Sequence, residues 1–407
     1  MSDDLFARLG PDFLQNPYLV YEMLRSAGPV TWAPGVFGIG GFIVTSHALC
    51  GSVLRSKSFI KEGERVLSPE QLAKIPQERE KISERRKANM LFRDPPDHTR
   101  LRGLVNQAFT PRVVERLRPH VASIAEHLLD AMEKKRPSAD LIHEYAFALP
   151  IIVIAELLGV PPEDRDMFKA WSTDLTLGLS PNATPEDLDR VQRAIAPMDA
   201  YLHRVIEERR KEPRADLISE LVRVQDAGDK LSMNELTATC RLLLTAGHET
   251  TVNLIGNGML ALLRNRDQLE ALKADPSLLH GAVEELLRYD SPVQMTMRFA
   301  FDDETELGGK TVKRGDLLML ILGAGNRDAE VFEDPNRLDV KRANAAQHLS
   351  LGGGIHYCLG APLARIEGEL AIGALLRRFP DIALAEGPLK YRKNLVLRGL
   401  ESLPVTF

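Results

Sequence analysis

The residues best suited to metal chemistry lie in one short stretch near the carboxyl end of the chain, HLSLGGGIHYCLGAPLAR at positions 348–365. Cys358 lies two residues after His356 and just before a predicted helix. A thiol is a strong metal ligand only as the thiolate, which the unpaired amides and the dipole of a helix N-terminus favour. Gly352 allows a tight turn, and Gly360 allows amides after the sulfur to point back at it. The stretch therefore predicts a metal-binding thiolate.

A second stretch, LLLTAGHETT at positions 242–251, lies in the middle of a long predicted helix. Ser232 and Glu235 form a capping box at its start, and no proline interrupts the chain before Asn265. Such a helix would be about 50 Å long and would cross the molecule. Gly247 at its midpoint costs roughly 1 kcal/mol relative to alanine. Two explanations stay open, a functional role or a close helix crossing that requires small residues.

Composition and charge argue against a nucleic-acid-binding, membrane-spanning, secreted or disulfide-rich protein. The 407 residues carry a net charge of -5, so neither nucleic acid nor a membrane is an expected partner. No signal-peptide core occurs in the first thirty residues, and no run of 18 uncharged apolar residues occurs elsewhere. The three cysteines lack C-x-x-C spacing, which predicts a reducing cytoplasmic environment without a disulfide framework. Cys50 and Cys240 are expected to be buried apolar side chains.

The elements that must position these two stretches form a mainly α fold with minor β structure. The charged run EREKISERRK is expected to be a solvated surface. No internal repeat is present. The pattern predicts a helix at 18–27, paired strands at 29–32 and 41–45, a charged loop at 60–90, helices from 98 to 290, strands at 298–322 and a last helix ending near 378.

Residues 351–360, LGGGIHYCLG, resemble the signature F-G-x-G-x-H-x-C-x-G of the cytochromes P450, the haem-thiolate monooxygenases. The departure is Leu351, where the family most often has phenylalanine. The resemblance implies haem b ligated by the Cys358 thiolate. It also implies one domain over 1–407, a triangular helical prism with a long central helix and small β-sheets. The small β-rich lobe would comprise 29–60, 298–322 and 385–407, and the rest would form the large α-rich lobe.

Haem carries two propionates, which require cationic or hydrogen-bonding partners. The resemblance implies four such partners, His98 and Arg102 in DPPDHTRLR, Arg298 in MTMRFA, and His356. The full set of residues expected to contact haem is His98, Arg102, Ala246, Gly247, Arg298, Leu351, Gly352, His356, Cys358 and Gly360.

Glu285 and Arg288 resemble the family's E-x-x-R motif, and their i, i+3 spacing places both charges on one helix face. The resemblance implies a buried network with a second arginine from the later connection. Arg337 is the preferred third member and Arg342 the alternative. This network is expected to support the cysteine loop and to have no catalytic role.

The segment from Ala246 to Thr250 resembles the family's A-G-x-E/D-T sequence on the distal side of haem. Cleavage of dioxygen requires protons while bulk water stays out. The resemblance implies that Ala246 and Gly247 leave room for dioxygen, that Thr250 donates to it, and that Glu249 relays protons from solvent. His248 occupies the variable position and is expected to face away. The thiolate favours O–O cleavage.

Oxygen-dependent turnover requires two electrons, and the chain contains no flavin-like or iron-sulfur segment. The resemblance implies a ferredoxin or flavodoxin with an NAD(P)H-dependent reductase, and an enzyme of secondary metabolism. A monomer is the default expectation. Its substrate would be a mid-sized, largely apolar molecule such as a terpenoid, steroid, fatty acid or polyketide, which it would hydroxylate or epoxidise. The residues expected to contact substrate are Ala246, Val293, Gln294, Thr296 and Leu397.

Two alternatives stay open. One is a peroxide-driven oxidase of the same fold, which Glu249 and Thr250 disfavour because members that use peroxide often lack this pair. The other is a haem-binding carrier or sensor that holds a ligand without turning it over.

Overall fold

A computed structural model describes residues 9–75, 77, 79, 81–82, 87–226 and 231–407. Most of the described chain is helical, as the sequence predicts. The helices are α1 Pro11–Gln15, α2 Pro17–Ala27, α3 His47–Arg55, α4 Pro69–Leu72, α6 Asp97–Ala108, α7 Pro111–Arg116, α8 Arg118–Glu133, α9 Ala148–Leu158, α10 Arg165–Leu177, α11 Pro185–Lys211, α12 Leu217–Asp226, α13 Met233–Arg264, α14 Arg266–Ala274, α15 Leu279–Tyr289, α16 Leu322–Gly325 and α17 Ala361–Arg378.

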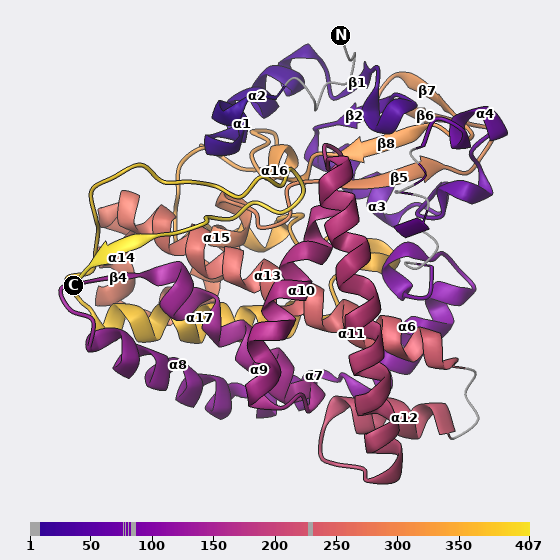
Figure 1. Cartoon of the computed structure of the whole chain (residues 1–407). Helices are drawn as coiled ribbons and strands as arrows, with labels where there is room; N and C mark the ends of the chain where they lie inside the picture. Colours follow the sequence, from indigo (N-terminus) through magenta and orange to yellow (C-terminus); the bar gives the residue numbers. More distant parts are fainter. Residues whose placement is uncertain (1–8, 76, 78, 80, 83–86, 227–230) are drawn as a thin grey trace.

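The strands form three small sheets. They are β1 Val30–Ala33, β2 Gly41–Val44, β3 Phe59–Ile60, β4 Ser138–Asp140, β5 Thr296–Ala300, β6 Glu304–Leu307, β7 Lys310–Lys313, β8 Leu317–Leu320, β9 Ala383–Leu384 and β10 Pro404–Thr406. The largest sheet has the order β1-β2-β8-β5-β3, so strands from both ends of the chain lie side by side in the upper right of Figure 1. The β6–β7 hairpin and the sheet β4-β10-β9 are separate.

Two of the three segments that the sequence assigns to a β-rich lobe contribute strands to the largest sheet. Residues 29–60 and 298–322 supply all the strands of the largest sheet except the first two residues of β5. The third segment, 385–407, contributes side chains to two different apolar cores. Leu395 packs in the apolar core of this lobe, whereas Leu403 and Val405 pack in the core of the helical body. The reason is strand pairing, because β10 pairs with β4 and β9 rather than with the largest sheet.

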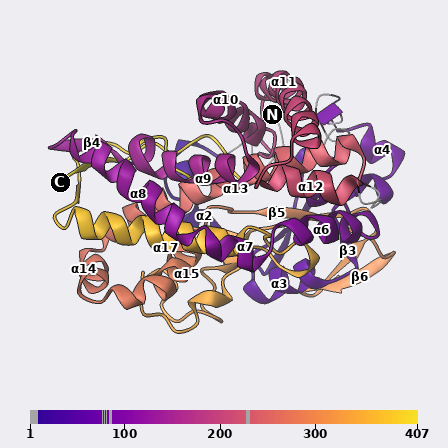
Figure 2. The same cartoon turned by 90° about the horizontal axis from the view of Figure 1, so that it is seen from below.

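Helix α13 crosses the centre of the helical body. The side chain of Ser232 accepts from the amide of Glu235, and the Glu235 carboxylate accepts from the amide of Ser232, which is the predicted capping box. Residues 251–263 are buried on every side, which is typical of a helix surrounded by others. Figure 2 shows α13 between a layer containing α10 and α11 and a layer containing α17 and α15.

Helix α17 begins directly after the cysteine loop and ends at Arg378, as predicted. Its buried side chains face α13, α15 and α8, so the start of the helix is fixed by the main core. Within the described residues, none of the helices is long and apolar enough to cross a membrane.

Candidate active site

The cysteine loop is held in one conformation by its backbone. The amide of Cys358 donates to the carbonyl of Leu351 at 2.9 Å, which closes the loop over the intervening glycines. Gly354 has φ +62, and a Cβ there would lie 2.3 Å from the carbonyl oxygen of Leu54 in α3. Glycine is therefore required at position 354 for both conformation and space. The Leu351 side chain is partly buried against the main core, so leucine fills the position usual for phenylalanine.

The three cysteines differ in their surroundings. Cys50 and Cys240 are fully buried, and burial raises the pKa of each thiol. Burial also raises the pKa of Cys358, but the amide of Gly360 and the charge of Arg102 act in the opposite direction. The backbone amides at the start of α17 lower the pKa of Cys358, but burial outweighs them. Cys358 alone among the three combines partial exposure with amide donors and nearby cations.

The four predicted propionate partners lie together beside this loop. The rings of His98 and His356 are 4.4 Å apart between centroids. Arg298 is 3% exposed and donates to the carbonyl of Met297. Arg102 lies close enough to Cys358 for their charges to interact. The structure therefore brings together residues from α6, β5 and the cysteine loop.

Within the part of the chain that the structure describes, the two imidazoles have nitrogens without hydrogen-bond partners, and neither arginine has a carboxylate partner of its own in a salt bridge. This pattern tests whether the group fits a bound dianion. Among the described residues, neither ring nitrogen of His98 has a hydrogen-bond partner, and Nε2 of His356 has none. Burial and then the charges of Arg298 and Lys61 lower the pKa of His356 to about 4. Burial also lowers the pKa of Arg298 to about 10. Buried polar groups normally have partners, so the set fits a group that supplies carboxylates.

Helix α13 has an accessible face at its midpoint. Ala246 is exposed and Thr250, one turn later, is partly exposed, although both lie on a helix at the centre of the molecule. The Thr250 hydroxyl donates to the carbonyl of Ala246 at 2.8 Å. Gly247 has a packing explanation, because a Cβ there would lie 3.2 Å from Cγ1 of Ile154 in α9. The close helix crossing accounts for this glycine without a contact to a cofactor.

Glu249 points away from that accessible face. Its carboxylate is 2% exposed, forms an ion pair with Arg392 and accepts from the Thr173 hydroxyl at 3.3 Å. Burial alone would raise the pKa of Glu249, but His248 and Arg392 lower it to about 2. His248 is fully buried against Ser172 and the carbonyl of Leu244, which agrees with the expectation that it faces away. A relay through Glu249 therefore requires the ion pair with Arg392 to open.

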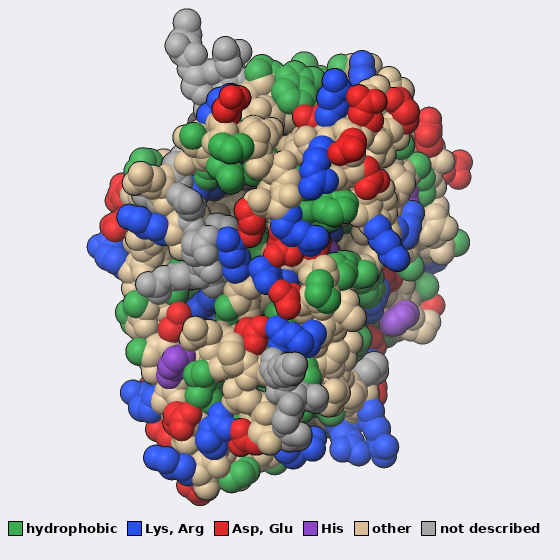
Figure 3. All heavy atoms as spheres, turned by 90° about the vertical axis from the view of Figure 1, so that its right-hand side faces the viewer, with side chains coloured by type: hydrophobic (Ala, Val, Ile, Leu, Met, Phe, Trp, Pro, Cys, Tyr) green, Lys and Arg blue, Asp and Glu red, His purple; other side chains and the backbone are tan. Residues whose placement is uncertain are grey.

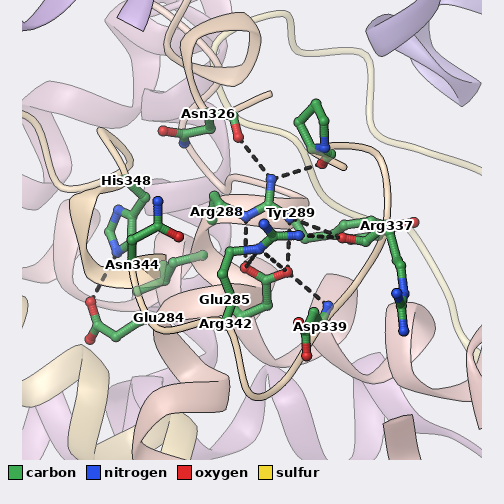
Figure 4. A network of polar contacts seen from close by, with 12 residues as sticks. Glu284, Glu285, Arg288, Tyr289, Asn326, Arg337, Asp339, Arg342, Asn344 and His348 are labelled. Carbon is green, nitrogen blue, oxygen red and sulfur yellow. Dashed lines mark hydrogen bonds and ion pairs between the residues drawn. The ribbon is translucent and has the colours of Figure 1, made fainter. Parts of the chain in front are cut away.

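The E-x-x-R pair forms a fully buried network (Figure 4). Arg288 donates to both oxygens of Glu285, at 2.6 and 2.8 Å, and both side chains are fully buried. The third side chain is Arg342, whose guanidinium lies 3.2 Å from the Glu285 carboxylate. The preference for Arg337 is wrong, because that residue contributes only its backbone carbonyl to Arg288. Its side chain is exposed and points away from the network in Figure 4.

A second network connects the same helix to the cysteine loop. Glu284 accepts from Arg365 and from His348 Nε2 at 3.1 Å, and Arg365 also donates to the hydroxyl of Tyr357. Although burial opposes it, these partners lower the pKa of Glu284 to about 2. The sequence interpretation missed this network, and the only signal for it was the pair of adjacent glutamates at 284 and 285.

The expected substrate residues are only partly brought together. Val293 and Leu397 form a β-bridge, and Ala246 is exposed on α13. Gln294 is 2% exposed, and its amide donates to the Ser291 carbonyl and the Tyr18 hydroxyl. The amide nitrogen of Gln294 is therefore used inside the protein, whereas its Oε1 has no hydrogen-bond partner among the described residues, so a contact with substrate stays a prediction. The Thr296 hydroxyl accepts from Lys61 at 2.9 Å.

Comparison with known proteins identifies the family. The family described as Cytochrome P450 matches residues 59–393. The chain belongs to the cytochrome P450 family. It is 42% identical to the Bacillus subtilis (strain 168) protein named polyketide biosynthesis cytochrome P450 PksS, over 100% of this chain and 99% of that protein. It is 43% identical to cytochrome P450 monooxygenase PikC of Streptomyces venezuelae, over 98% of this chain and 92% of that protein.

Solved structures agree with this assignment. The structure of P450BioI in complex with hexadec-9Z-enoic acid ligated acyl carrier protein has a TM-score of 0.90 and 38% identity, covering 98% of this chain and 100% of that chain. This cytochrome P450 is accordingly an oxidoreductase of the monooxygenase type with the P450 fold, and it uses the protoporphyrin IX haem with cysteine-thiolate ligation that is shared by its family.

Proposed function

We propose that this cytochrome P450 inserts one atom of dioxygen into a mid-sized, largely apolar substrate, with Cys358 as the thiolate ligand of haem b. The observation that carries this proposal is the cluster beside the Cys358 loop, in which Arg102 and Arg298 lie with two imidazoles that have nitrogens without hydrogen-bond partners among the described residues. His98, Arg102, Arg298 and His356 would hold the propionates. Bound haem supplies the redox chemistry that cleaves dioxygen, and thiolate ligation favours that cleavage.

Thr250 and Glu249 would manage protons on the distal side. The Thr250 hydroxyl must break its hydrogen bond to the Ala246 carbonyl before it can donate to dioxygen. Glu249 must release Arg392 before its carboxylate can turn from the protein interior toward Thr250. Proton delivery would then be gated by an ion pair between α13 and the 391–400 segment.

The substrate class rests on the apolar character of the expected contact residues. Ala246, Val293 and Leu397 are apolar, and the amide nitrogen of Gln294 already donates inside the protein. Relatives include proteins named for polyketide biosynthesis and for vitamin D(3) 25-hydroxylation. These names support a polyketide-like or terpenoid-like substrate with few oxygens, which the enzyme would hydroxylate or epoxidise.

Electrons would come from a separate ferredoxin or flavodoxin with its NAD(P)H-dependent reductase. On the face shown in Figure 3, basic and acidic side chains are interspersed, which gives no support for nucleic acid as a partner. A monomer, a cytoplasmic location and a single domain over 1–407 stay predictions.

One observation favours the peroxide-driven alternative. Glu249 is fixed as a carboxylate by Arg392, so the direct proton relay is closed in this conformation. Turnover of a lauric acid or terpenoid probe with hydrogen peroxide alone should be much slower than turnover with NAD(P)H, ferredoxin and reductase. The reverse order of rates would favour the peroxide-driven oxidase, and substrate binding without product in either system would favour a carrier.

A further inference from the structure

Lys61 follows strand β3 and lies next to β5. The antiparallel register pairs Ile60 with Phe299, so the next pair in register would place Lys61 opposite Arg298. The Lys61 ammonium donates to the Thr296 hydroxyl at 2.9 Å. Like charges directly opposite each other in a sheet are destabilising. The two neighbouring cations, Lys61 directly after β3 and Arg298 in β5, therefore require an anion to compensate their charges.

Asp94 compensates these two cations only in part. Its Oδ2 accepts from the backbone amides of Lys61 and Glu62, both at 2.8 Å. Its Oδ1 lies 4.0 Å from His356 Nε2. Glu62 is paired with Arg93 and Arg65. Burial and then the charge of Arg298 lower the pKa of Lys61 well below its usual range, whereas the charge of Asp94 raises it.

Lys61 lies in the same cluster as the expected propionate partners. Asp94, which accepts from the backbone amide of Lys61, lies 4.0 Å from Nε2 of His356. The three cations Lys61, Arg102 and Arg298 outnumber this carboxylate, so the cluster favours an added anion.

We propose that Lys61, oriented by Thr296, is a further haem-binding residue whose ammonium ion pairs with a propionate carboxylate. The proposal rests on the proposed function only in requiring that haem is bound at Cys358. It also assigns Thr296 to positioning Lys61 instead of contacting substrate. A carboxylate on a substrate has the same chemistry as a propionate, so the test separates the two.

The test measures the rate at which ferric haem transfers from the holo-protein to excess apomyoglobin. Lys61→Met should release haem about tenfold faster, which corresponds to about 1.4 kcal/mol. Lys57→Met, which removes an exposed lysine four residues earlier, is the matched control and should release haem at the original rate. Lys61→Arg should restore slow release because it keeps the charge. Equal release rates for Lys61→Met and the unsubstituted protein would overturn the proposal.

A second measurement identifies the anion. With haem dimethyl ester, which has no propionate charge, the Lys61→Met protein and the unsubstituted protein should release the cofactor at equal rates. A tenfold difference that persists with the ester would show a merely structural effect and overturn the proposal. A third outcome would also overturn the proposal. In the spin-shift titration, Lys61→Met would bind laurate more weakly but lauryl alcohol equally well, and haem release would be unchanged. The partner of Lys61 would then be a substrate carboxylate.

The proposed function has its own readout in the same samples. The red-shifted Soret band of the reduced carbon monoxide complex should be present in both the unsubstituted and the Lys61→Met protein. Its absence from the unsubstituted protein would contradict the function, whereas its presence together with unchanged haem release would contradict only the role of Lys61.

Discussion

The buried network around Glu285 allows a direct test of which arginine supports the cysteine loop. Arg342 has an 8% exposed side chain, lies 3.2 Å from the Glu285 carboxylate and donates to the Glu333 carbonyl at 2.6 Å. Arg337 offers only a backbone carbonyl to this network, and its side chain is exposed. Substitution of either arginine by methionine removes one positive charge, so each controls for the other.

The expected loss of stability follows from these contacts. Hydrogen bonds to charged groups contribute about 1.5–3 kcal/mol, so Arg342→Met should lower the free energy of unfolding by about 2–3 kcal/mol. Arg337→Met should lie within about 0.5 kcal/mol of the unsubstituted protein, as is usual for a surface substitution. Glu285→Gln should cost more, about 3–5 kcal/mol, because it leaves Arg288 buried without its carboxylate.

Urea unfolding followed by far-UV circular dichroism and by the Soret band would measure these differences. The Soret band should disappear at lower urea in Arg342→Met than in Arg337→Met, because we expect the network to support the loop that holds Cys358. Equal midpoints for the two variants, or a lower midpoint for Arg337→Met, would refute the assignment of Arg342 as the third member.

Three other predictions concern the distal helix and the loop. Thr250→Ala should keep the red-shifted carbon monoxide band but form about tenfold less product per NAD(P)H consumed, with the remaining electrons released as hydrogen peroxide. The reason is that a positioned proton donor contributes roughly 10²–10⁴-fold. An unchanged yield of product per NAD(P)H would contradict this role. The pKa of Glu249 is lowered from 4.5 to about 2, so its contribution to stability is present above pH 4.5 and is lost as the pH falls toward 2. The unfolding free energy should therefore decrease less in Glu249→Gln than in the unsubstituted protein between about pH 6 and about pH 3, by about 2–3 kcal/mol. An equal decrease in both proteins would contradict the ion pair. Gly354→Ala should prevent haem incorporation, as measured by the Soret absorbance per protein, whereas Gly309→Ala, which has a similar φ of +74 in open space, should cost only about 1 kcal/mol; normal haem content in Gly354→Ala would contradict the contact with Leu54.

The sequence predicts the local features of this protein well because they depend on short-range chemistry. The capping box at Ser232, the start of α17 after Gly360 and the β6–β7 hairpin at Gly308 follow from hydrogen bonds and backbone freedom within a few residues. The grouping of His98, Arg298 and His356 was predicted only through the resemblance to a family, since these residues are far apart in the sequence.

The errors concern side chains whose partners are distant in the chain. Arg337 and Arg342 both follow the same connection, and only the folded backbone decides which guanidinium turns inward. The hydrogen bond from the amide nitrogen of Gln294 to Tyr18 was also not predictable, because the two residues lie 276 positions apart in the sequence. Lys61 was overlooked because a lone lysine after a short strand is ordinarily a surface charge.

The optical spectrum of the purified, reduced protein under carbon monoxide tests the central claim most directly. Thiolate ligation by Cys358 predicts a strongly red-shifted Soret band that disappears in Cys358→Ala. A Soret band at the position typical of histidine ligation, or a red-shifted band that persists in Cys358→Ala, would contradict the claim.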